Sequence, residues 1–220
     1  MKLNFIHIGK CGGSSVLNAL VNSEIIKEKY NSILHTHTIK PIYQRNEDYI
    51  ITIRNPISRL LSAYNWRYYL VVESENQKNR FKGEWEILNK YKTLNNMAEK
   101  LFDECTNSVD LKVSQEFEVI HHIRERISFY LLDFLDVVNI NQIYGVLKQE
   151  SLEQDCKKLL GVEIPHLKNH KSKTLPTYLN LSEKALNNLK RHFSDEFTCV
   201  KKLFELGIID EEDYKILENY

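Results

Sequence analysis

The sequence predicts one α/β domain over residues 1–220, in which a central parallel sheet is flanked by helices. Three apolar runs carry this prediction, at 3–8, 49–54 and 142–147, because each has the length of a buried strand and the first two lead through a turn into a helical pattern. A chain of 220 residues with 42% hydrophobic residues is long enough to bury a core. We find no repeat, low-complexity tract or linker that would divide it.

The first half of the chain contains two strand-to-helix units. The first predicts a strand at 3–8 and a helix at 14–29, and a short mixed segment at 32–39 follows. The second predicts a strand at 49–54 and an aromatic-rich helix at 57–72. Residues 49–54 are apolar nearly throughout, which is typical of a central strand in a parallel sheet.

The second half of the chain is less regular. Residues 73–92 are polar and charged, and since a surface excursion of that length is uncommon unless functional, we expect a flap over the acceptor. Ser151-Leu-Glu-Gln154 is a capping-box pattern that predicts a helix to Leu160. The remaining expected elements are helices at 94–105 and 114–135, a strand at 142–147, a loop at 161–179 and a helical region at 182–206 that breaks near 193–195.

Composition narrows the classes of partner. Thirty basic and thirty acidic residues cancel, so no overall field recruits nucleic acid or a membrane surface, and any anion site must be a local cluster. The four cysteines lack C-x-x-C spacing, which disfavours a zinc ribbon or a redox pair and favours a reduced, cytoplasmic protein. The sequence has no apolar run of membrane-spanning length and no signal-peptide pattern, so we expect no membrane span.

An anion-binding turn is predicted after the first strand. Its glycines allow a sharp turn and bring backbone N–H groups close to a ligand, a lysine adds a positive charge, and two serines stand at the start of the next helix. We expect the cysteine in this turn to be a small filler and not a nucleophile. The segment is Lys10, Cys11, Gly12, Gly13, Ser14 and Ser15.

A second anion-binding turn is predicted after the strand at 49–54. Arg54 stands at the strand end, Pro56 at the first helical position and Ser62 eight residues after the arginine. Arginine makes bidentate, charge-assisted contacts with phosphate. Two such turns in one small chain predict a ligand with two separated phosphate groups.

Three familiar phosphate loops do not fit the first turn. A Walker A loop places lysine after its last glycine, whereas Lys10 precedes Gly12 and Gly13. A cysteine-dependent phosphatase loop needs arginine six places after Cys11, and that residue is Leu17. The dinucleotide pattern G-x-G-x-x-G is also absent from the sequence.

Both turns resemble motifs of the sulfotransferase superfamily. His7-Ile-Gly-Lys-Cys-Gly-Gly-Ser-Ser15 resembles its loop for the 5′-phosphosulfate of 3′-phosphoadenosine 5′-phosphosulfate (PAPS). The segment from Arg54 to Tyr64 is similar to its 3′-phosphate motif, with Asn55 where many relatives have aspartate. The resemblance implies sulfuryl transfer from PAPS to a hydroxyl, release of adenosine 3′,5′-bisphosphate, and a P-loop-like phosphosulfate-binding turn. It covers roughly the first 70 residues.

A histidine is the expected base, because its pKa suits proton abstraction near neutral pH. His35-Thr-His37 lies between the two motifs, and the spacing resembles heparan sulfate 2-O-sulfotransferases, whose second histidine is the base. The resemblance implies that His37 is the base and His35 a supporting residue. Lys10 is expected to stabilise the charge that develops on the leaving phosphate.

His121 and His122 form a competing pair, for which we favour a structural role because neighbours on a helix point in different directions. A metal at His35 and His37 lacks a matching carboxylate or cysteine pattern, so no metal is expected. Lys171 and Lys173 belong to a basic loop that the resemblance to carbohydrate sulfotransferases implies covers the nucleotide.

Two other functions stay open at this point. A different phosphotransferase on a P-loop-like fold would need Mg²⁺ ligands, and a non-catalytic nucleotide-binding module would keep Lys10, Arg54 and Ser62 but be indifferent to His37. The resemblance favours a saccharide as the hydroxyl-bearing acceptor. Lipid, phenol and peptide tyrosine acceptors remain open, as does the oligomeric state.

Overall fold

The computed structural model describes residues 1–164 and 180–220. These residues fall into two compact units, each built from separate stretches of chain. The first unit comprises 1–56, 125–164 and 195–220, and the second comprises 57–124 and 180–194. The prediction of one sulfotransferase-like domain over 1–220 is not tested by this division and stays a prediction.

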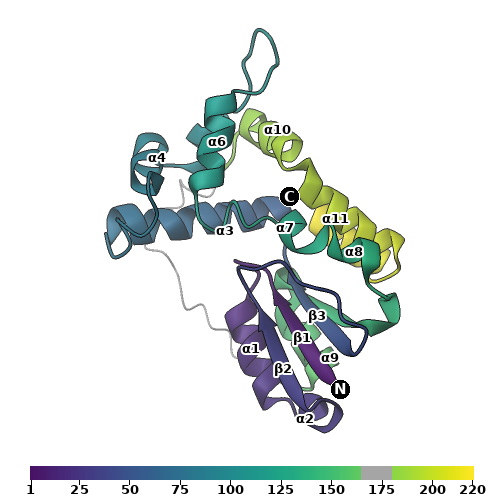
Figure 1. Ribbon diagram of the computed structural model, residues 1–220. Helices are drawn as coiled ribbons and strands as arrows, with labels where there is room; N and C mark the ends of the chain where they lie inside the picture. The colour runs from purple at the N-terminus through teal and green to yellow at the C-terminus, as the bar shows by residue number, and fades with distance from the viewer. Residues whose placement is uncertain (165–179) are drawn as a thin grey trace. The chain divides into compact units, whose positions relative to one another are not determined.

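The first unit is α/β, with a four-stranded parallel sheet in the order β2-β1-β3-β4 (Figure 1). The three predicted strands are present, and β3 is a central strand as expected. The mixed segment at 32–39 supplies the edge strand β2. The strands are β1 (Lys2–His7), β2 (Ser32–Thr36), β3 (Glu47–Ile53) and β4 (Ile143–Lys148).

Helices flank the sheet on both faces because successive strand residues point to opposite sides. Leu3, Phe5 and Ile50 belong to one buried cluster, and Ile6 and Ile51 belong to the other. The first cluster includes residues of α1 (Gly13–Asn22), α2 (Glu24–Lys29) and α9 (Leu152–Leu160). The second includes residues of α7 (Ile127–Leu131), α8 (Phe134–Val137), α11 (Ser194–Glu205) and α12 (Glu211–Glu218).

The predicted helix at 14–29 is in fact two helices, α1 and α2, that meet at Ser23. The backbone of Ser23 is extended and its hydroxyl accepts the N–H of Ile26, which caps α2. The same hydroxyl donates to the carbonyl oxygen of Leu160 at 2.5 Å. A serine favours such a cap over a helix interior, and this overrides the helical pattern on either side.

The second unit is helical. Its long helix α3 (Pro56–Tyr68) begins at a proline, as predicted, and runs into the π-helical turn η1 (Tyr69–Glu73). The predicted excursion at 73–92 contains the helix α4 (Glu84–Tyr91), and Glu84 is buried in an ion pair with Arg67 at 2.6 Å. At least this part of the segment is therefore packed structure, and its role as a flap stays a prediction.

The later helices are shorter than predicted. The stretch at 94–105 forms only α5 (Leu94–Ala98), and 114–135 is divided among α6 (Leu111–Val119), α7 and α8. The predicted break near 193–195 is confirmed, since α10 (Glu183–His192) ends one residue before Phe193. Short 3₁₀ turns lie at η2 (Ile140–Gln142) and η3 (Gln149–Ser151).

The predicted capping box at Ser151 does not form. Its hydroxyl donates to the Asp155 carboxylate at 3.0 Å and makes no cap to the helix N-terminus. The same carboxylate also accepts from the backbone N–H and the ammonium of Lys148. The Ser151 hydroxyl therefore belongs to this hydrogen-bonded group and not to a capping box. Among the residues that the structure describes, no helix has the length and apolarity needed to cross a membrane.

Candidate functional site

The candidate site lies at one edge of the sheet of the first unit. The strands are parallel, so their carboxyl ends meet at the same edge, where ligands bind in open α/β sheets. Lys10 follows β1, His37 follows β2, and Arg54 follows β3. Glu150 follows β4 at the same edge. Three of these four residues were predicted from the sequence, and Glu150 was not.

The turn after β1 is tight and partly strained. The N–H of Cys11 donates to the carbonyl oxygen of Ile8 at 3.3 Å, and Lys10 has a φ of 70°. A left-handed backbone at a residue that is not glycine costs free energy and is concentrated at functional sites. Gly12 has a φ of 78°, in the left-handed region that favours glycine.

Arg54 and the turn after β1 are in contact. One terminal nitrogen of Arg54 donates to the carbonyl oxygen of Lys10 at 3.4 Å. The Nε of Arg54 is buried, and among the described residues it has no hydrogen-bond partner. A buried donor without a partner costs about 1–3 kcal/mol, which an anion bound at this point would recover.

Asn55 fixes the segment after β3. Its backbone N–H donates to the Glu150 carboxylate at 2.9 Å. Its side-chain amide donates to the carbonyl oxygens of Leu217 at 2.8 Å and Asn219 at 3.1 Å. An ionised aspartate would present only acceptors to those two carbonyls. This gives a physical reason for asparagine at a position where the resembled motif often has aspartate.

Four aromatic rings stack on one face of β1 and β2. Phe5 and His7 alternate along β1, and His35 and His37 are likewise two residues apart. The parallel register pairs Phe5 with His35. The centroids of the His7 and His37 rings are 4.1 Å apart, and those of His7 and His35 are 5.2 Å apart. Aromatic rings at every second position in both segments predict this stack. The sequence analysis used only His35 and His37.

A hydrogen bond to a backbone carbonyl defines the proton position of neutral His37. Nδ1 of His37 lies 2.9 Å from the carbonyl oxygen of His7. Because a carbonyl only accepts, Nδ1 of His37 carries the proton and Nε2 carries the lone pair when the ring is neutral. Nδ1 of His7 shares a 2.9 Å hydrogen bond with Nε2 of His35. Partial burial and the neighbouring His37 lower the pKa of His35.

The other predicted ligand contacts differ in their placement. Ser14 is exposed and Ser15 half-buried in the first turn of α1, while the Cys11 side chain is buried in the core, as expected for a filler. Ser62 lies on α3 in the second unit, so a shared contact with Arg54 stays a prediction. Lys171 and Lys173 lie outside the described residues.

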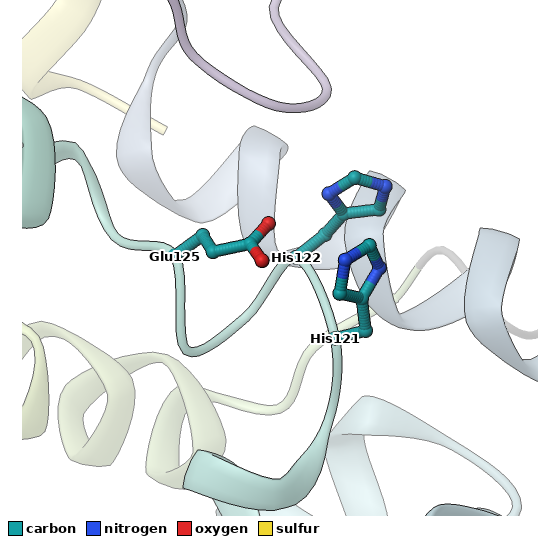
Figure 2. Close-up of side chains that lie close together, drawn as sticks. All are labelled: His121, His122 and Glu125. Carbon is teal, nitrogen blue, oxygen red and sulfur yellow. The ribbon is translucent and has the colours of Figure 1, made fainter. Parts of the chain in front are cut away.

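The competing pair His121 and His122 lies in a turn after α6 and not on a helix, contrary to the prediction. Figure 2 shows both rings with the carboxylate of Glu125, and the possible ligand atoms of these three residues lie within 4.8 Å of one another. The carbonyl oxygen of His122 accepts from the buried guanidinium of Arg59 at 2.8 Å. The expectation that the protein holds no metal stays a prediction.

Arg59 lies within the segment that resembles the second motif, where it could either contact the ligand or face solvent. Its side chain is fully buried in the second unit and donates to the backbone of His122. It is a structural residue of that unit.

Comparison with family models, curated proteins and solved structures gives no match for this chain.

Proposed function

We propose that this chain is a sulfotransferase that moves the sulfuryl group of PAPS to a hydroxyl acceptor, with His37 as the base. The observation that carries the proposal is the contact between Arg54 and the turn of Lys10, because it brings the two predicted anion-binding segments together. The sequence motifs at these segments resemble those that bind the two phosphate ends of PAPS in sulfotransferases.

The donor would bind along the edge formed by β1 and β3. Lys10 and the first turn of α1 would hold the 5′-phosphosulfate, with backbone N–H groups at Gly12 and Gly13 and the hydroxyls of Ser14 and Ser15. The Arg54 guanidinium would hold the 3′-phosphate, to which its Nε and terminal nitrogens offer donors. Ser62, Lys171 and Lys173 are proposed as further contacts, on the basis of the motif resemblance alone.

The transfer step balances without a metal or a redox partner. The acceptor oxygen attacks sulfur, and its proton passes to Nε2 of His37, which becomes an imidazolium. The bond between sulfur and the bridging phosphate oxygen breaks, and adenosine 3′,5′-bisphosphate leaves. Lys10 would stabilise the negative charge that develops on that oxygen. The neutral tautomer of His37 derived above is the one that this step requires.

The acceptor is proposed to be a saccharide, in keeping with the carbohydrate sulfotransferase pattern. The expectations of a cytoplasmic protein with no nucleic-acid partner follow from composition and stay predictions. A screen with ³⁵S-labelled PAPS against saccharide, phenol, lipid and tyrosyl-peptide acceptors tests the activity. We expect label to move to saccharides. Absence of transfer to every class would leave a nucleotide-binding module as the better description.

A further inference from the structure

The imidazole ring of His7 packs against the turn after β1. At Gly13, the first residue of α1, a Cβ would lie 1.9 Å from the His7 ring and 2.1 Å from its Nε2. This Cβ position is set by the backbone, and no side-chain adjustment of position 13 itself could relieve the overlap. The ring of His7 therefore occupies the space that a side chain at position 13 would take.

His7 also contacts His37 in two ways. Its carbonyl oxygen accepts from Nδ1 of His37 at 2.9 Å, and its ring stacks on the His37 ring with an interplanar angle of 17°. Its own Nδ1 shares a 2.9 Å hydrogen bond with Nε2 of His35, so the His7 ring is held by a second contact. The two contacts together fix both the tautomer and the plane of His37.

We infer that His7 is a positioning residue that couples the turn containing Gly13 to the base His37. This inference rests on the proposed function, since it assigns His7 to the same transfer site. His7 would not exchange a proton with the acceptor. It would hold His37 so that Nε2 carries the lone pair and faces a fixed direction, and it would transmit any shift of the turn to that ring.

The first test reads the state of His37 directly, without any substrate. In ¹³C-labelled protein, relaxation of the imidazole C–H groups gives the order parameter of each histidine ring. His7→Ala keeps the backbone carbonyl that accepts from Nδ1 of His37, so the Nδ1–H tautomer should persist, but loss of the stacked ring should lower the order parameter of the His37 ring. We expect the same fall in Gly13→Ala, which displaces the His7 ring without altering any histidine.

A matched variant separates the stacking contact from the hydrogen bond. His35→Phe removes the bond to His7 but leaves the contacts of His7 with Gly13 and His37, so the order parameter of the His37 ring should stay at the wild-type value. An unchanged circular dichroism spectrum shows that each variant is folded. If the order parameter of the His37 ring is unchanged in folded His7→Ala and Gly13→Ala, the inference is wrong.

The second test uses the transfer reaction. Displacement of a catalytic group by about 1 Å can cost around 10²-fold in rate, so His7→Ala should lower kcat by up to that factor. The KM for PAPS should stay close to the wild-type value, because His7 does not contact the donor in this scheme. An equal loss in kcat and donor affinity would assign His7 to the integrity of the turn and overturn the coupling role.

The two tests separate this inference from the proposed function. If adenosine 3′,5′-bisphosphate binds but the order parameter of the His37 ring is insensitive to the His7 side chain, the sulfotransferase proposal stands and the coupling role fails. If His37 responds to His7 but the nucleotide does not bind, the structural coupling is real and the proposed reaction is wrong.

Discussion

The neutral tautomer of His37 is set by a backbone acceptor. Nδ1 faces the carbonyl oxygen of His7, so the lone pair of the neutral ring is on Nε2. The neighbouring His35 has a lowered pKa, caused by partial burial and then by His37, and it remains neutral to a lower pH than a histidine in water. A neutral neighbour opposes the developing charge on His37 less than an imidazolium would.

Replacement of His37 by alanine should abolish the base but not the donor site. We predict a fall in transfer rate of about 10²–10⁴-fold, the usual contribution of a positioned base. Affinity for adenosine 3′,5′-bisphosphate, measured by calorimetry, should not change. His121→Gln serves as the control and should transfer at the wild-type rate. A loss of rate in that variant with full activity in His37→Ala would place the base at the competing pair.

Sequence patterns at the residue scale located Lys10, His35, His37 and Arg54 at one sheet edge, as the structure has them. They could not identify Glu150, because its role depends on β4 lying beside β3, which is a long-range pairing. A single sequence contains no local signal for such a pairing.

At the scale of elements, helix boundaries were the least predictable feature. The pattern over 14–29 is helical on both sides of Ser23, but the serine caps the second helix and reaches Leu160, far along the chain. The helix α4 was missed because the segment at 73–92 is polar. The helix can be buried because its charged residue Glu84 forms an ion pair with Arg67.

The ion pair of Arg67 and Glu84 should be essential to the second unit. Both side chains are almost fully buried, and Glu84 also accepts from the N–H of His121. Glu84→Gln would leave the guanidinium without its counter-charge, and we predict a loss of about 3–5 kcal/mol in the free energy of unfolding. Urea denaturation monitored by fluorescence measures this loss.

A surface ion pair provides the matched control for that experiment. Glu75 and Lys78 are paired at 2.8 Å, with Glu75 exposed and Lys78 partly exposed, so Glu75→Gln should change stability by less than about 0.5 kcal/mol. Equal effects of the two glutamine variants would show that the buried pair contributes no more than an exposed one.

At the scale of the whole molecule, the net charge of zero leaves local clusters to determine electrostatic behaviour. One such cluster joins three elements of the first unit, since the buried Lys148 of β4 pairs with Asp155 of α9 and Asp213 of α12. Burial by itself would lower the pKa of Lys148, but the two carboxylates outweigh it and the pKa is raised.

This raised pKa predicts a loss of stability in alkali. A group whose pKa is higher in the folded state contributes its stability fully below the unfolded value of about 10.4 and loses it as pH rises through the folded value. The difference in unfolding free energy between the wild type and Lys148→Met should therefore shrink above about pH 10. Urea titrations from pH 7 upward measure it, and a difference that grows with pH would contradict the assignment.

The central claim is that Lys10 and Arg54 hold the two phosphate ends of one nucleotide, and calorimetric titration with adenosine 3′,5′-bisphosphate tests it most directly. The account predicts binding that is tighter than that of ATP with Mg²⁺. It also predicts that Arg54→Gln weakens this binding by about 10- to 100-fold, the value of a charge-assisted phosphate contact. A preference for ATP with Mg²⁺, or an unchanged affinity in Arg54→Gln, would contradict it.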